Sequence, residues 1–214
     1  MTVFAAGVSA TWMLTRAYGA VSLLLLTAAF ALGVADVARW RSRTWPRFAI
    51  DALHRNIALL ALAFVVVHVL TTVLDRFVSI GLAAAVVPFS NGYRGGFWLG
   101  LGAVAFDLFV ALIATSMLRR RIGLRVWRAV HWAAYACWPV ALLHAVGTGT
   151  DASQPWMLGL ALGCTAAIGA AVIARLTLGG AGGREPDPPS RRGAGEPQRP
   201  ARRPARARQG MLTR

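Results

Sequence analysis

The residues of this chain best suited to metal chemistry are its four histidines, His54, His68, His131 and His144. His68 follows His54 by fourteen positions, and His144 follows His131 by thirteen. A neutral imidazole on each side of a planar macrocycle ligates haem iron and leaves no open axial position, which suits electron transfer. One of the first two histidines and one of the last two could therefore ligate the same haem.

Long apolar segments must position these histidines. Of the 214 residues, 57% are hydrophobic and 14% are charged, whereas a soluble domain carries about 25% charged residues. A helix needs about 20 apolar residues to cross a bilayer. Five runs approach that length, namely Ala17–Ala35, Asn56–Leu74, Phe97–Leu118, Val130–Thr148 and Pro155–Ala174. The sequence therefore predicts an all-α integral membrane helical bundle of about five transmembrane helices.

The second and fourth predicted helices carry the histidines at matching depths. His54 and His131 each follow an arginine-rich connection, and His68 and His144 lie roughly 20 Å deeper at about 1.5 Å per residue. His54 and His68 share a face, but thirteen residues of ideal helix leave the other two about 140° apart. Pro139 lies between them, so we expect a kink there that restores their aim.

Histidines inside a membrane have a simpler explanation as well. A lone histidine is often a hydrogen-bonding group between helices. Polar residues at such depth are costly and tend to be functional, and here all four fall at two matching levels. We favour ligation, and a haem-free transporter or scaffold, in which the histidines relay protons or hold helices together, stays as the alternative.

Arginine alone supplies the positive charge of the chain, whose net value is +15. Nine of the 23 basic residues lie in the last 34 residues, and the others gather at helix ends, so the sequence does not favour nucleic-acid binding. Arginines crowd the connections between helices one and two and between helices three and four. The positive-inside rule then predicts a multi-pass protein of the cell membrane, with the N-terminus outside and the C-terminus cytoplasmic.

Arg55 and Arg128 flank the inner histidines, His54 and His131, and could bind haem propionates. Membrane anchoring explains these two arginines equally well.

The two ends of the chain differ in composition from the bundle. Residues 1–15 are apolar but short, so we expect an interfacial or partly inserted segment, with a short sixth helix as the alternative. Residues 16–178 form the predicted haem-binding transmembrane bundle. Residues 179–214 are rich in Gly, Pro and Arg, and we expect a disordered cytoplasmic tail that contacts anionic lipid.

Several further residues carry weaker signals. Asp107 interrupts the third apolar run, and we expect it to face the bundle and form a hydrogen bond with a Ser or Thr, with a proton-linked or haem-adjacent polar site as the alternative. The aromatic residues Trp127, Trp132, Tyr135 and Trp138 could line a porphyrin, but an interfacial belt predicts nearly the same pattern. Both cysteines lie in apolar runs without paired spacing, which does not favour a disulfide or a zinc site.

The chain resembles the ferric reductase-like transmembrane domain family, which includes NADPH oxidases, yeast ferric reductases and the haem subunit of the bacterial methionine sulfoxide reductase system. The resemblance covers roughly Ala17–Leu178. It rests on the spacings H-x13-H and H-x12-H and on the segments Val86–Trp98 and Thr115–Asp151. It implies a haem-bearing bundle that passes electrons across the membrane, with two b haems held by His54/His131 and His68/His144. The methionine sulfoxide reductase subunit is similar around the fourth helix, and His54 here completes a second pair.

No G-x-G-x-x-G motif follows a strand in the tail, so we expect an oxidoreductase component without its own flavin or NAD(P)H domain. Electrons would then pass to or from a separate flavoprotein, a quinol or a reductase subunit. A quinol-linked membrane-anchor haem subunit of an oxidoreductase complex is the second hypothesis.

Overall fold

The computed structural model describes residues 10–37, 47–75, 80–90, 96–148 and 153–181. Within these ranges every regular element is a helix, which confirms the predicted all-α class. The helices in chain order are α1 (Ala10–Val37), α2 (Arg47–Leu74), α3 (Leu82–Val86), α4 (Gly96–Ile122), α5 (Leu124–His131), α6 (Ala134–Thr148) and α7 (Pro155–Ala181).

Five segments are long and apolar enough to cross a membrane, as the sequence predicted. They are Thr11–Ala35, Phe48–Leu74, Gly96–Ile122, Leu124–Thr148 and Pro155–Thr177, and the fourth contains both α5 and α6. Many large apolar side chains on these spans point away from the protein, including Leu70, Met117 and Leu162. Such surfaces suit contact with lipid rather than with water. The chain is a multi-pass membrane protein.

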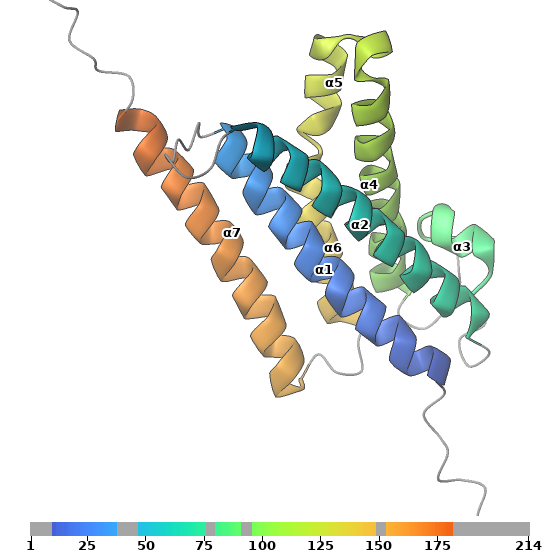
Figure 1. Ribbon diagram of the computed structural model, residues 1–214. Coiled ribbons are helices and arrows are strands. Elements are labelled where there is room, and N and C mark those ends of the chain that lie inside the picture. Colours follow the sequence, from blue (N-terminus) through green and yellow to red (C-terminus); the bar gives the residue numbers. More distant parts are fainter. Residues whose placement is uncertain (1–9, 38–46, 76–79, 91–95, 149–152, 182–214) are drawn as a thin grey trace, which may run out of the picture. The chain divides into compact units, whose positions relative to one another are not determined.

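Helix α1 lies between α2 and α7, and α4 packs against α6 (Figure 1). Two small cores join these helices. Leu23, Trp138, Cys164 and Ile168 connect α1, α6 and α7. Ala61, Phe109, Leu112 and Cys137 connect α2, α4 and α6. Because α6 contributes to both cores, its position is fixed from two sides.

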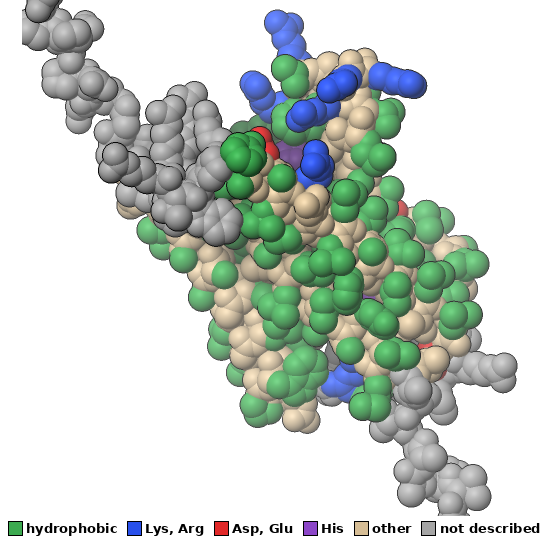
Figure 2. Space-filling model, viewed as in Figure 1, with side chains coloured by type: hydrophobic (Ala, Val, Ile, Leu, Met, Phe, Trp, Pro, Cys, Tyr) green, Lys and Arg blue, Asp and Glu red, His purple; other side chains and the backbone are tan. Residues whose placement is uncertain are grey.

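A single glycine reverses the chain between α4 and α5. Gly123 has a φ of 82°, a left-handed conformation that glycine adopts without the steric penalty of a Cβ. Its amide donates to the Arg119 carbonyl at 3.1 Å and closes the end of α4. Arg119, Arg120 and Arg121 occupy the last turn of α4, and Arg128 the last turn of α5. Figure 2 shows these basic side chains gathered where α4 and α5 meet, and we call this region the Arg-rich end.

The fourth span is interrupted between His131 and Ala134, a break that the sequence did not predict. Helix α6 continues through Pro139, whereas α5 and α6 part at Trp132 and Ala133. The Ala133 and Tyr135 amides donate to carbonyls three residues earlier, at 2.8 and 3.1 Å. Such bonds turn the chain by about 120° per residue instead of about 100°. This overwinding reduces the angular mismatch between His131 and His144.

The ends of the bundle differ slightly from the predicted boundaries. Helix α1 begins at Ala10, so the last part of the expected N-terminal segment continues into the first span. Helix α7 ends at Ala181. Residues 1–9 and the predicted tail from residue 182 lie outside the described residues. Cys137 and Cys164 are both buried free thiols.

Candidate functional site

The structure brings the four histidines together as two pairs. His54 of α2 and His131 of α5 have ring centres 6.4 Å apart with their planes at 75°. His68 of α2 and His144 of α6 have ring centres 6.4 Å apart at 79°. Each pair therefore joins the second and fourth spans. We call His54 and His131 the Arg-end pair, and His68 and His144 the cavity pair.

The spacing within each pair suits an atom held between the rings. An imidazole nitrogen lies about 2 Å from a metal it ligates, so two ligating rings have centres roughly 6 Å apart. A direct N–H···N hydrogen bond would need nitrogens about 3 Å apart and hence ring centres nearer to 5 Å. Among the described residues no hydrogen bond joins the two rings of either pair. The spacing of 6.4 Å thus fits bis-imidazole ligation.

Three of the rings are oriented by backbone carbonyls of neighbouring helices. His54 Nδ1 donates to the Ala29 carbonyl at 2.8 Å, and His68 Nδ1 donates to the Thr15 carbonyl at 2.8 Å. His144 Nδ1 donates to the Trp98 carbonyl at 2.9 Å. Because a carbonyl can only accept, the proton is on Nδ1, and Nε2 keeps its lone pair. This arrangement is typical of metal-ligating histidine, whose second nitrogen is tied to an acceptor.

The same three rings each lie against a glycine. A Cβ added to Gly33 would lie 3.3 Å from the nearest atom of the His54 ring. The same distance would be 2.9 Å between Gly19 and His68, and 2.5 Å between Gly102 and His144. Each glycine follows the acceptor carbonyl by four residues, which is about one turn along the same helix face. The carbonyl and the glycine therefore form one seat for an imidazole, and we call this combination a histidine cradle. The glycines gave no signal in the sequence analysis, although Gly19 and Gly33 repeat the fourteen-residue spacing of His54 and His68.

His131 has no such cradle. Its Nδ1 is buried without a hydrogen-bond partner. The Trp127 ring stacks on it instead, with ring centres 4.8 Å apart and planes at 27°. The Trp127 indole N–H donates to Ser116 Oγ at 3.2 Å, which anchors the indole to α4. Of the four aromatic residues considered in the sequence, Trp127 is the one whose ring stacks on a histidine.

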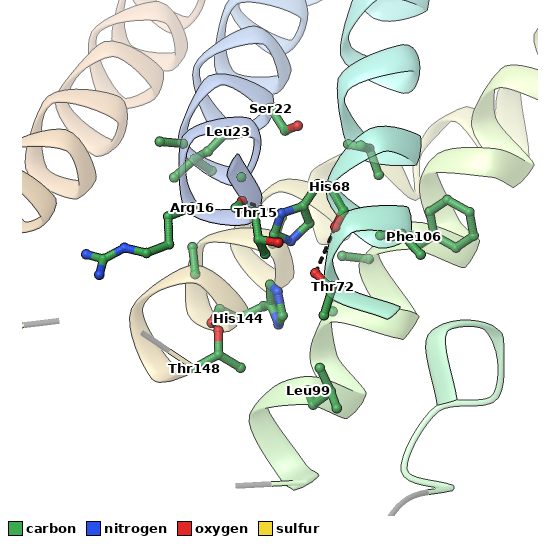
Figure 3. A pocket seen from close by; sticks show the side chains of 18 of the residues that line it. Thr15, Arg16, Ser22, Leu23, His68, Thr72, Leu99, Phe106, His144 and Thr148 are labelled. Atoms are coloured by element: carbon green, nitrogen blue, oxygen red, sulfur yellow. Dashed lines mark hydrogen bonds between the residues drawn. The ribbon is translucent and has the colours of Figure 1, made fainter. Parts of the chain in front are cut away.

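A cavity of about 580 Å³ surrounds the cavity pair. Figure 3 shows His68 and His144 pointing into this space between the helices. Its lining is mainly apolar, with the polar side chains Ser22, Thr72 and Thr148 among it. Thr15 Oγ1 and Ser22 Oγ are buried there without a hydrogen-bond partner. A largely apolar cavity with a few polar groups, of this size, is typical of a cofactor site.

Arg16 lines this cavity as well, and the sequence analysis did not select it. Its guanidinium lies 4.0 Å from the centre of the Trp12 ring and 5.5 Å from that of Trp156. Arg55 and Arg128, the two predicted propionate partners, have exposed side chains at the other end of the bundle. Neither forms a hydrogen bond or an ion pair with another described residue.

The other candidate residues lie away from the histidine pairs or form structural contacts. Trp138 is buried and its indole donates to Thr27 Oγ1 at 2.9 Å, which ties α6 to α1. Tyr135 accepts a hydrogen bond from Arg175, and Trp132 stacks on Tyr135. Asp107 is half-buried, and the expected bond to a Ser or Thr is not present among the described residues. Those residues also contain no group of three or more His, Cys, Asp or Glu side chains that could hold a bare metal ion.

Comparison with known families identifies the class of protein that this bundle defines. Residues 17–147 match the family described as the ferric reductase like transmembrane component. The matched range contains all four histidines and more than half of the chain, so the protein belongs to this family. Ferric reductase-like domains are generally redox proteins associated with haem. Neither the curated proteins nor the solved structures yield a match to this chain.

Proposed function

We propose that this protein carries electrons across the membrane through two b haems. One would be ligated by His54 and His131 and the other by His68 and His144. The observation that supports this most strongly is the repeated ring separation of 6.4 Å in both pairs. Three of the four imidazoles also carry their proton on Nδ1 and keep the lone pair of Nε2, as an iron ligand requires.

The chain itself would hold the cofactors rigidly. A haem b with two imidazole ligands supplies one-electron exchange between ferric and ferrous iron without an open coordination position. The carbonyls of Thr15, Ala29 and Trp98 would keep three rings from rotating. A ligand held in one orientation needs little rearrangement when the iron changes charge, which favours fast electron exchange.

Arginines at both ends of the bundle would hold the haem propionates. Arg55 and Arg128 lie near the Arg-end pair, and Arg16 lies at the cavity that holds the other pair. A guanidinium binds a carboxylate through two parallel hydrogen bonds, so these residues match the chemistry of a propionate.

The distribution of arginines between the two ends of the bundle also supports one direction of insertion in the membrane. We propose that the Arg-rich end faces the cytoplasm, with the N-terminus outside and the C-terminus inside the cell membrane. Electrons would enter one at a time from a separate flavoprotein, quinol or reductase subunit. They would leave to a one-electron acceptor on the opposite side, so that the donor is oxidised and the acceptor reduced by equal numbers of electrons.

A difference spectrum of the purified protein, reduced minus oxidised, tests this proposal together with its iron content. We expect a haem b spectrum and about two haems per chain. His68→Ala, His144→Ala and the double variant should each keep about one haem, because both residues would serve the same iron. Trp132→Phe, which changes an exposed aromatic residue outside both pairs, should keep both haems. Iron-free protein, or full haem content in the double variant, would overturn the proposal.

A quinol donor has its own test. Titration of the reduced and oxidised protein with a soluble quinol and quinone should move the haem spectrum if the protein is a quinol-linked anchor subunit. A flavoprotein-dependent carrier should respond to a reduced flavin carrier and not to the quinol.

A further inference from the structure

The two histidine pairs are not equivalent in what orients them. Both rings of the cavity pair donate to carbonyls, through Thr15 and Trp98. In the Arg-end pair only His54 does so, through Ala29. His131 keeps a buried Nδ1 without an acceptor. The inference below rests on the proposed haem ligation and concerns this difference.

The helix register shows where a fourth cradle would lie. On α1 the two cradles are fourteen residues apart, with carbonyls at Thr15 and Ala29 and glycines at Gly19 and Gly33. On α4 the cradle of His144 uses Trp98 and Gly102. The same step of fourteen residues leads from these two to Leu112 and Ser116. Ser116 thus occupies the position that is glycine in the other three cradles.

Both components of this fourth position are already in use. The Leu112 carbonyl accepts a hydrogen bond from Thr115 Oγ1 at 3.3 Å, and the Leu112 side chain is buried in the core of α2, α4 and α6. Ser116 Oγ accepts from the Trp127 indole, and that indole covers the His131 ring. Trp127 therefore fixes the plane of His131 by stacking, where the other histidines are fixed by hydrogen bonds.

We propose that Trp127 is the positioning residue of His131, and that the haem of the Arg-end pair has the higher reduction potential. A hydrogen bond from Nδ1 to a carbonyl makes imidazole a stronger electron donor, which favours ferric iron and lowers the potential. The cavity pair has two such bonds and the Arg-end pair has one. The cationic side chains of the Arg-rich end act in the same direction, since positive charge favours the state that has gained an electron.

A protein that has received one electron would not share it equally between the two pairs. The electron would exchange between the two proposed haem sites, one iron being oxidised as the other is reduced. With a tenfold preference, which corresponds to about 59 mV for one electron, the Arg-end haem holds it in most molecules. The protein would then store its first electron at the Arg-rich end and pass it to the cavity pair against a small gradient.

A redox titration of the full-length protein, followed at the haem b absorption band, tests the order of the potentials. We expect two components that differ on the order of tenfold in their reduction equilibrium, about 59 mV or more. His144→Ala should remove the component of lower potential, and His131→Ala the component of higher potential. Equal potentials, or the opposite assignment, would overturn this inference while leaving the two-haem proposal intact. Haem-free protein would overturn both.

Variants of Trp127, with a variant of Trp132 as the control, test the positioning role of Trp127. Trp127→Leu removes the ring over His131, so we expect a shifted or broadened low-spin ferric electron paramagnetic resonance signal from the Arg-end haem. Its midpoint potential should change as well, with the cavity haem unchanged. Trp127→Phe keeps an aromatic face and should preserve the signal. Trp132→Leu is the matched control, because Trp132 stacks on Tyr135 and not on a histidine. An unchanged signal in Trp127→Leu, or an equal effect on both haems, would contradict the assignment.

Discussion

The His144 imidazole occupies the space that a Cβ of residue 102 would need, with two ring atoms only 2.5 Å from that position. A side chain there must displace the ring, because real Cβ atoms essentially never make contacts that short. The contact joins α4 to α6 beside the cavity, so the identity of one residue on α4 controls the position of a proposed haem ligand on another helix.

Gly102→Val should therefore cost the protein the haem of the cavity pair and leave the other haem in place. The measured quantity is haem per protein in the purified variant, which should fall from about two to about one. Gly159→Val is the control, since nothing lies within 4 Å of a Cβ at that position on α7. Retention of both haems by Gly102→Val would contradict the placement of this cofactor.

The propionate role of the inner arginines predicts a specific loss. Arg55→Gln and Arg128→Gln should each weaken the Arg-end haem, because a hydrogen bond to a charged group contributes about 1.5–3 kcal/mol. Loss of haem to an excess of apomyoglobin, followed over time, reports this weakening for each haem. Arg120→Gln removes an equal charge from the last turn of α4 and should lose haem at the rate of the unmodified protein.

The bond between Trp138 and Thr27 predicts an effect on stability that is separate from the cofactor. Trp138→Phe leaves Thr27 Oγ1 without its buried donor, which should lower the free energy of unfolding by about 1–3 kcal/mol. Denaturation in detergent, measured with the haem content matched, checks this value. Trp132→Phe changes an exposed residue of the same span and should be nearly neutral.

The proposed orientation can be tested by chemical labelling of intact cells. Ser153→Cys adds an exposed thiol at the connection between α6 and α7, and Arg120→Cys adds one at the Arg-rich end. A membrane-impermeant maleimide should label the first in intact cells and the second only after the cells are opened. The natural thiols at Cys137 and Cys164 are buried and should give little background. The reverse pattern would invert the proposed topology.

The sequence predicted the spans because apolar length alone determines what crosses a bilayer. It also predicted which histidines lie together, because depth in parallel helices depends only on residue count. It did not predict the break in the fourth span, since the i→i−3 bonds at Ala133 and Tyr135 involve backbone groups with no residue signature. It named Trp127 only as one of four aromatic candidates and did not select Arg16. Aromatic and basic residues near a membrane surface are common, and only the contacts distinguish one from another.

Backbone carbonyls are the acceptors in all three cradles, and this affects how relatives of this protein should be compared. Any residue that maintains the helix at positions 15, 29 and 98 supplies the same oxygen, so substitution there leaves the imidazole bonds intact. A side chain in place of Gly19 or Gly102 would have to displace the imidazole, and one in place of Gly33 would press on it more weakly. An alignment of relatives would therefore reveal the cradles through glycines at positions 19, 33 and 102. It would give no sign of the backbone carbonyls that accept the hydrogen bonds.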